Sequence, residues 1–268
     1  MSGMPDHLTL PWVDSHCHLD MEAFDEDREA VLARAREAGV GTMLLVGGVD
    51  ERAGHRRALE LAGRLGFPAS AGVHPHEARL ADESVYDELL GLAREGRLVA
   101  IGEVGLDFHY DHSPRPVQRE VFRRQVRMAR EVGLPLIVHT READQETAAL
   151  LEDEGAAEVG GVIHCFTGGF ELARRALALG FHISFSGIVA FPRSQVIQDV
   201  ARTLSADRLL VETDAPFLAP PPHRGKRNEP AFVVEVARRV ASLRGEPLAQ
   251  VAEAAAQNFA RLFRRPAV

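Results

Sequence analysis

The segment Gly133-Leu134-Pro135-Leu136-Ile137-Val138-His139 shows the pattern that decides the fold. It follows residues 116–132, an amphipathic stretch rich in Arg and Glu that predicts a helix. Gly133 is typical of the residue that ends a helix, and the apolar residues after it predict a buried strand that ends at His139. The fold class can therefore be predicted from the number of times that this pattern of helix, glycine and strand recurs along the chain.

The same unit recurs along the whole chain. Short runs rich in Val, Ile, Leu and Ala predict eight strands, at residues 12–15, 40–46, 68–73, 98–103, 134–139, 161–164, 181–185 and 209–214. Helices are predicted at residues 25–38, 51–65, 83–94, 116–132, 142–154, 169–179 and 194–204, with two more after Asn228. Eight strands that are each followed by a helix are typical of an α/β protein with a single (β/α)8 TIM barrel. We expect one domain over residues 1–268, and the alternative is a doubly wound open sheet.

The composition narrows the class of protein. The chain has 268 residues, of which 46% are hydrophobic, so it can bury a large core. No apolar run approaches the roughly 20 residues that span a bilayer, and residues 1–11 lack the basic and apolar segments of a secretory signal. The only cysteines are Cys17 and Cys165, and we expect them to be unpaired in a reducing compartment. These features predict a cytoplasmic protein that does not associate with membranes.

The net charge of −8 argues against a protein that coats nucleic acid, because phosphate backbones are usually met by a basic surface. It leaves open a nucleic-acid substrate that is held locally by metal ions.

Histidines and carboxylates end most of the predicted strands. The active site of a (β/α)8 barrel lies at the carboxyl ends of its strands, so these side chains are expected to converge. They are His16, His18, His74, His76, Glu103, His139, His164, Glu212 and Asp214. Such a group is costly to bury unless its members are paired or coordinate metal. The sequence therefore predicts a metal site.

The types of ligand indicate the metal and the number of ions. Imidazole and carboxylate without thiolate suit Zn, Mn, Fe or Ni, and a site with bound waters also admits Mg. Five or six protein ligands exceed the three that usually hold one catalytic zinc, so we expect two divalent ions. Glu103 is best placed to bridge them, because the fourth strand lies between the two groups of histidines. Asp214, beside the first strand, is expected to complete one ion site and to accept a proton from the reacting water.

Glu212 has two interpretations that both stay open. It lies two residues before Asp214 and shares its face of the strand. It is either a buried acceptor that orients a ligand or a ligand to a third ion.

At these positions the chain resembles the TatD family of metal-dependent deoxyribonucleases, which belongs to the amidohydrolase-like barrels. The matching motifs are Asp14-Ser-His16-Cys-His18-Leu19, Gly72-Val-His74-Pro75, Gly102-Glu103-Val-Gly105-Leu-Asp107, Val138-His139, His164-Cys-Phe-Thr-Gly168, Glu212-Thr-Asp214-Ala-Pro216 and Arg224-Gly-Lys-Arg-Asn228-Glu-Pro230. The resemblance implies a TIM barrel, two or more divalent ions and hydrolysis of phosphodiester bonds from the 3′ end of DNA. It implies a set of six ligands: His16, His18, Glu103, His139, His164 and Asp214. It also implies that His74 contacts the scissile phosphate.

We therefore expect a DNase that uses Mg, Mn or Zn to activate a water, in DNA repair or degradation, mainly on single-stranded ends and without an obligate protein partner. Arg141 and Arg224 are expected to hold flanking phosphates. Lys226 and Arg227 are interpreted as surface charges, and His76 as a loop residue.

Stacking on bases is a second possible source of affinity. Three aromatic residues follow the strands, but ordinary packing is at least as good an explanation for them: Phe108, Tyr110 and Phe166. Cys17 alternates with His16 and His18 and is expected to face away from the metals, into the barrel packing.

Two other functions fit the same residues. One is a metal-dependent hydrolase of amide, lactone or aminoacyl ester bonds, because the same ions can attack a carbonyl group. The other is a non-catalytic partner of nucleic-acid processing whose metals are structural.

Overall fold

Eight parallel strands lie in chain order in the computed structural model, which describes residues 12–48 and 53–263. They are β1 (Trp12–Cys17), β2 (Val40–Gly48), β3 (Ala69–Gly72), β4 (Ala100–Asp107), β5 (Leu136–Arg141), β6 (Gly161–Ile163), β7 (His182–Phe185) and β8 (Leu209–Val211). The end of β1 meets the chain that follows β8, where Cys17 pairs with Ala215. The amide of His18 donates to the carbonyl of Ala215 at 2.8 Å, so the ring of strands is closed. The predicted (β/α)8 barrel is confirmed, and the doubly wound alternative is wrong.

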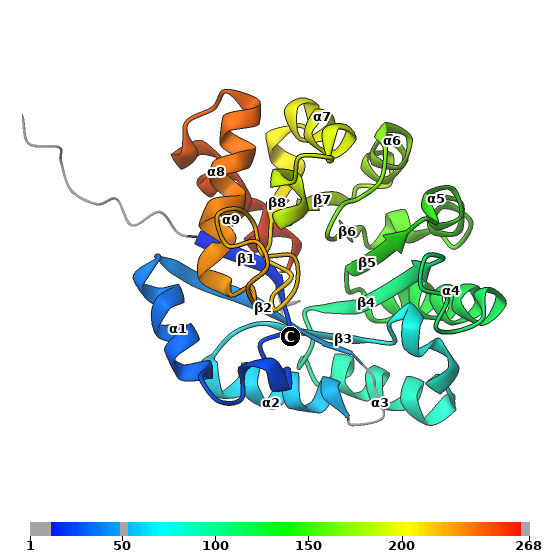
Figure 1. Cartoon of the computed structure of the whole chain (residues 1–268). Coiled ribbons are helices and arrows are strands. Elements are labelled where there is room, and N and C mark those ends of the chain that lie inside the picture. The colour runs from blue at the N-terminus through cyan, green and yellow to red at the C-terminus, as the bar shows by residue number, and fades with distance from the viewer. Residues whose placement is uncertain (1–11, 49–52, 264–268) are drawn as a thin grey trace, which may run out of the picture.

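The α-helices surround this ring (Figure 1). They are α1 (Arg28–Glu37), α2 (Gly54–Leu65), α3 (Glu83–Arg94), α4 (Arg115–Val132), α5 (Asp144–Asp153), α6 (Phe170–Ala178), α7 (Gln195–Thr203), α8 (Val233–Arg244) and α9 (Leu248–Leu262). Each predicted helix is present, although residues 51–52 of the second lie outside the described residues. No helix in the described part of the chain is long and apolar enough to cross a bilayer.

Two glycines show why the helices end where the sequence predicted. Gly66 follows α2 with φ 75°, and Gly133 follows α4 with φ 66°. Both angles lie in the left-handed region, which glycine enters without the strain that a Cβ atom imposes. Their amides donate to carbonyls of the last helical turn, so each helix stops and the chain returns to the next strand.

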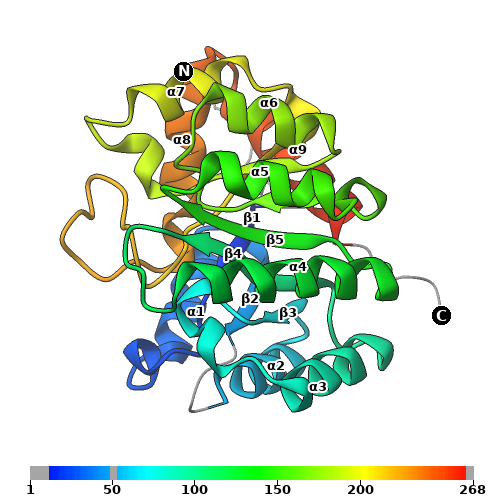
Figure 2. The same ribbon diagram turned by 90° about the vertical axis from the view of Figure 1, so that its right-hand side faces the viewer.

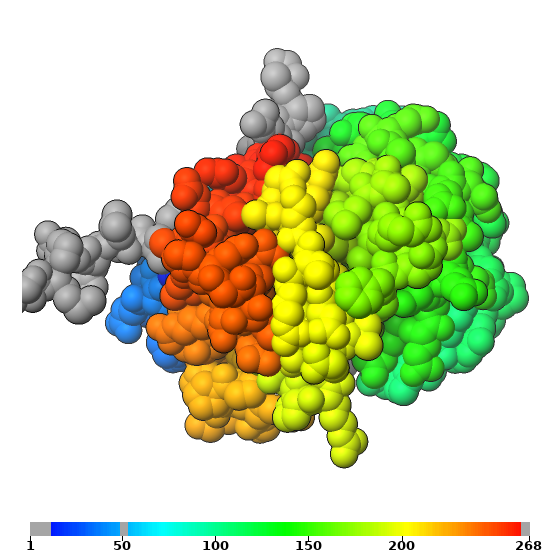
Figure 3. All heavy atoms as spheres, turned by 90° about the horizontal axis from the view of Figure 1, so that it is seen from above, coloured from blue at the N-terminus to red at the C-terminus, as the bar shows by residue number. Residues whose placement is uncertain are grey.

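The strands are buried on both faces, as expected for parallel strands between a barrel interior and covering helices. Every residue of β4 is buried, and so is every residue of β1. In Figure 3 the atoms of α7 (yellow) and α8 (orange) form continuous bands on the outside of the barrel. This rigid frame holds the strand ends in fixed positions.

Most strand bounds differ by a few residues from the prediction, and two of these differences affect the site. β4 continues past Glu103 to Asp107, because it stays paired with β5 as far as Asp107 and Arg141. β8 ends at Val211, so the predicted end at Asp214 is wrong, and Asp214 has φ 58°, outside extended geometry. Figure 2 shows the orange connection from β8 to α8 projecting from one end of the barrel.

Candidate metal centre

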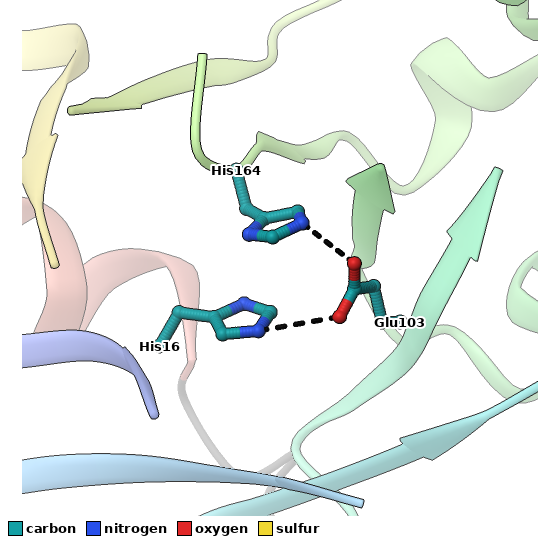
Figure 4. Close-up of side chains that lie close together, drawn as sticks. All are labelled: His16, Glu103 and His164. Atoms are coloured by element: carbon teal, nitrogen blue, oxygen red, sulfur yellow. Dashed lines mark hydrogen bonds and ion pairs between the residues drawn. The ribbon is translucent and has the colours of Figure 1, made fainter. Parts of the chain in front are cut away.

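The carboxylate of Glu103 lies at the centre of the predicted cluster. Its Oε1 is 2.7 Å from His164 Nε2 and 3.0 Å from Nδ1 of the His139 imidazole. Its Oε2 lies on the other side, 3.3 Å from His16 Nε2. Figure 4 shows His16, on β1, and His164, just after β6, approaching different oxygens of Glu103. One buried carboxylate thus joins two groups of imidazoles.

The first group is formed by His16, His18 and Asp214. The two Nε2 atoms of His16 and His18 are 3.1 Å apart, and Asp214 Oδ1 is 3.8 Å and 3.5 Å from them, respectively. Nδ1 of His18 lies 2.9 Å from the carbonyl of Val46, which accepts a hydrogen bond from it, so Nε2 of His18 faces His16. A proton or a metal ion between the two Nε2 atoms satisfies both of them. This arrangement fits a cation.

The turn that carries Asp214 is fixed by buried polar residues. Asp14 accepts hydrogen bonds from the amide and hydroxyl of Thr213, at 2.9 Å and 2.5 Å. Asn228 donates to the carbonyls of Thr213 and Phe217, at 2.8 Å and 2.6 Å. Burial raises the pKa of Asp14 to about 7, although its bonds to Thr213 oppose this shift. These contacts hold Asp214 beside β1.

The second group contains His139, whose ring is held between two carboxylates. Nδ1 faces Glu103, and Nε2 lies 3.1 Å from Asp107 Oδ2. The same Asp107 oxygen is 2.8 Å from His76 Nε2, and its Oδ1 accepts the amides of His109 and Tyr110. Burial works against ionisation, but the hydrogen bonds from His139 and His76 hold the pKa of Asp107 well below its usual range. An ionised carboxylate behind a histidine fixes its tautomer and orientation.

Glu212 lies behind His164. Its Oε1 is 3.3 Å from His164 Nδ1 and accepts the amide of Cys165 at 2.7 Å. Its Oε2 is buried and has no hydrogen-bond partner among the described residues. The geometry therefore puts Glu212 against the outer edge of the His164 ring, and Nε2 on the inner edge faces Glu103.

His74 is placed as a hydrogen-bond donor. The amide of His76 donates to His74 Nδ1 at 3.2 Å, so the neutral ring carries its proton on Nε2. That Nε2 lies 3.2 Å from Glu103 Oε1. Burial lowers the pKa of His74 to about 4, against the opposing effect of Glu103. The ring is therefore neutral near pH 7.

The charges of the cluster are strongly coupled. Burial raises the pKa of Glu103, but the surrounding histidines, His164 first, outweigh burial and hold this pKa well below its usual range. Burial likewise opposes the charged form of His18, but Asp214 and Glu103 raise its pKa to about 9. Protons and metal ions compete for the same nitrogen lone pairs. The carboxylates that favour the protonated form of His18 also favour a metal cation at the same nitrogen.

The donor atoms form three overlapping groups, in each of which the atoms lie within 4.8 Å of one another. These groups are His16, Glu103 and His164; His16, His18 and Asp214; and His74, Glu103 and His139. The residues therefore fit metal ions held by imidazole and carboxylate.

The centre opens into a cavity of about 910 Å³. Arg141 lines this cavity, and so do two exposed aromatic residues, Tyr110 and Phe217. Arg224 does not line it: the Arg224 guanidinium rests 4.2 Å from the centre of the Phe191 ring. Phe217 was not predicted, because no spacing rule in the sequence points to it.

The other predicted residues fall into two groups. Phe108 and Phe166 are buried, so the packing interpretation is confirmed for them. Lys226 and Arg227 are exposed, as predicted, and Arg227 pairs with Asp27 at 2.7 Å.

Both cysteines are free. Cys17 is fully buried and its thiol donates to the Leu44 carbonyl at 3.6 Å, which confirms that it faces the barrel packing.

Asp107 is the residue that sequence reasoning missed. The predicted strand stopped at Glu103, so Asp107, at the end of the Gly102–Asp107 motif, had no predicted role in the centre. Residues four apart on a strand share a face, so Asp107 joins the face of Glu103 only once β4 is seen to continue that far.

Comparison with known proteins identifies the family. The profile described as TatD related DNase matches residues 13–264. An uncharacterized metal-dependent hydrolase of Bacillus subtilis, YabD, is 42% identical over 94% of this chain and 98% of its own length. The 3'-5' ssDNA/RNA exonuclease TatD of Cronobacter sakazakii is 38% identical over 93% of this chain and 97% of its own.

A solved structure agrees with these matches. The crystal structure of YJJV, a TatD homologue of Escherichia coli, superposes with a TM-score of 0.89 and 31% identity, covering 97% of this chain and all of the other. The sequence and the structure thus match the same family over nearly the whole chain, and the imidazole and carboxylate groups at the strand ends agree with it. The chain belongs to the TatD family of metal-dependent hydrolases.

Proposed function

We propose that this hydrolase is a 3′–5′ exodeoxyribonuclease that removes nucleotides from single-stranded DNA ends. The observation that carries the proposal is the Glu103 carboxylate, which lies between two groups of donor atoms at the base of an open cavity. Support also comes from the Cronobacter sakazakii relative, whose name describes a 3'-5' ssDNA/RNA exonuclease.

Two divalent ions, Mg, Mn or Zn, fit this arrangement best. His16, His18 and Asp214 would hold one ion. His139 and His164 would hold the other, and Glu103 would be shared by both. When bound, such ions lower the pKa of a water towards neutrality and stabilise charge on the phosphate oxygens.

The chain's own residues complete the chemistry. Asp214 faces the first group, and although burial opposes it, His18 holds its pKa below the usual value. It is therefore ionised and can accept the proton of the attacking water. His74 is neutral and its Nε2–H points into the cluster, so it donates to an oxygen of the scissile phosphate. Arg141, on the cavity wall, offers two parallel donors to a phosphate.

In our proposal, Glu212 orients a metal ligand and does not bind an ion itself. Its contact with His164 Nδ1 leaves Nε2 of that ring for an ion. A carboxylate that accepts from the outer nitrogen of a histidine ligand is a common arrangement in metal sites. We therefore favour the orienting interpretation of Glu212 over a third ion site.

Digestion of end-labelled DNA tests the proposal. The protein is incubated with single strands that carry the label at the 3′ or the 5′ end, under Mg, Mn and Zn, beside a lactone and an aminoacyl ester. We expect mononucleotides to be released first from the 3′ label. Turnover of the esters without release of nucleotides from either strand would overturn the proposal.

A further inference from the structure

A second cavity of about 700 Å³ adjoins the metal cavity. Arg141, Thr167 and Ile188 line both, so the two share a wall. Arg193 and Ser194, from the connection between β7 and α7, form the far side of the second cavity. Figures 2 and 3 show the yellow-green chain of this connection projecting from the barrel.

We infer that this second cavity binds the phosphate of a nucleotide on the 5′ side of the scissile bond, held by Arg193 and Arg141. The inference rests on the proposed nuclease function. An enzyme that removes the 3′-terminal nucleotide holds the end of the strand at its metals. Only the strand on the 5′ side is then long enough to reach a neighbouring cavity.

The carboxylates of the second cavity are already engaged. Glu142 accepts from His109 Nδ1 at 2.7 Å, and Glu146 accepts from Arg119 at 3.0 Å. Asp144 accepts the amide of Gly169 at 3.2 Å. Among the described residues, none of these three carboxylates forms an ion pair with Arg141 or Arg193.

The two arginines lack such partners. No carboxylate within residues 12–48 and 53–263 forms an ion pair with Arg141 or Arg193, whereas neighbouring Arg119 and Arg175 are each paired. Nε of Arg141 is buried and has no hydrogen-bond partner in this part of the chain, and its guanidinium lies 5.4 Å from the Tyr110 ring centre. A guanidinium that no carboxylate neutralises is suited to a phosphate, which it binds through two parallel N–H groups.

The position of Arg141 connects the two cavities. It follows His139 on β5 by two residues and lies in the shared wall. The strand on the 5′ side of the scissile bond passes Arg141 into the second cavity, where the exposed Arg193 contacts the same phosphate as Arg141. The cavity thus favours substrates that have phosphates beyond the scissile one.

Two substrates distinguish the contribution of the second cavity to activity from that of the metal centre. Thymidine 5′-(4-nitrophenyl phosphate) carries one phosphodiester bond, with nitrophenol in place of the 5′ strand, whereas hexathymidylate fills both cavities. The test compares kcat/KM on the two substrates for the wild type, Arg193→Ala and a control, Arg97→Ala. Arg97 is also exposed, but it precedes β4 at the opposite end of the barrel.

We expect Arg193→Ala to lower the ratio of kcat/KM on hexathymidylate to that on the nitrophenyl ester about tenfold. Arg97→Ala should leave the ratio unchanged. Fluorescence anisotropy of labelled hexathymidylate with the metal-chelated protein gives a second readout. The salt dependence of log K should become less steep by about 0.7 in Arg193→Ala, as for one lost phosphate contact on a single strand.

Two results would overturn the inference in different ways. If the wild type degrades hexathymidylate, and Arg193→Ala matches Arg97→Ala in ratio and salt dependence, the second site is wrong and the nuclease proposal stands. If the wild type hydrolyses the nitrophenyl ester and leaves hexathymidylate intact, both proposals fall.

Discussion

Replacement of Asp107 by Asn tests whether this carboxylate sets the metal affinity of the centre. Asp107 Oδ2 lies 3.1 Å from His139 Nε2 and 2.8 Å from His76 Nε2, and Oδ1 accepts two backbone amides. In Asp107→Asn, the amide oxygen can satisfy the backbone, but the NH2 group then faces two ring nitrogens. His139 must give up its Nε2 proton, so its proton moves to Nδ1, the nitrogen that faces Glu103.

The expected loss follows from this change of tautomer. Outer carboxylates that orient a histidine ligand contribute about 10-fold to 100-fold in metal affinity. This corresponds to about 1.4 to about 3 kcal/mol of binding free energy. Titration of the metal-free protein with Mn²⁺ by calorimetry measures the affinity, and circular dichroism checks that the variant is folded. The matched control is Glu142→Gln, in which the carboxylate that pairs with His109 is exposed. An affinity of Asp107→Asn within twofold of Glu142→Gln would refute the reasoning.

Three further outcomes are expected. Glu212→Gln should lower kcat/KM on single-stranded DNA about tenfold, because the oxygen that accepts from His164 loses its negative charge. The number of bound ions measured by mass spectrometry should not change, and a lost ion would contradict this role. Each metal ion at 100 times its Kd should stabilise the protein by about 2.7 kcal/mol, so removal of two ions by a chelator should lower the melting temperature by about 10 to 20 °C in calorimetry. An unchanged melting temperature would contradict a metal centre in the folded protein. His182 is buried at the start of β7, and burial lowers its pKa to about 4. Since the unfolded chain binds this proton more tightly, stability from this group is full above pH 6.5 and falls towards pH 4. The free energy of unfolding in urea should therefore drop between pH 7 and pH 4.5 by about 2 to 3 kcal/mol more in the wild type than in His182→Leu; equal drops would exclude this role for His182.

The parts of the fold that depend on local chemistry were predictable. The glycines that end helices are local signals, because the left-handed backbone at Gly66 or Gly133 depends on that residue alone and not on a distant partner. The alternation of His16, Cys17 and His18 likewise placed the thiol in the packing before any partner was known.

The features that depend on distant partners were not predictable. β4 reaches Asp107 because β5 continues beside it, and no residue near Glu103 signals this length. Arg227 finds its partner 200 residues away, at Asp27, so its structural role appears only in the folded chain. The centre shows the same difference: the strand ends predicted its histidines together with Glu103, Glu212 and Asp214, but the role of Asp107 behind His139 depends on the pairing of β4 with β5.

The central claim is that Glu103 joins two ions that act on a phosphodiester bond. The most direct test compares the wild type with Glu103→Ala on a 3′-labelled single strand at saturating Mn²⁺, with chromatography of the released mononucleotide. We expect Glu103→Ala to lose about a thousandfold in kcat, because both donor groups lose their shared carboxylate. Equal rates of mononucleotide release by the two proteins would contradict the account.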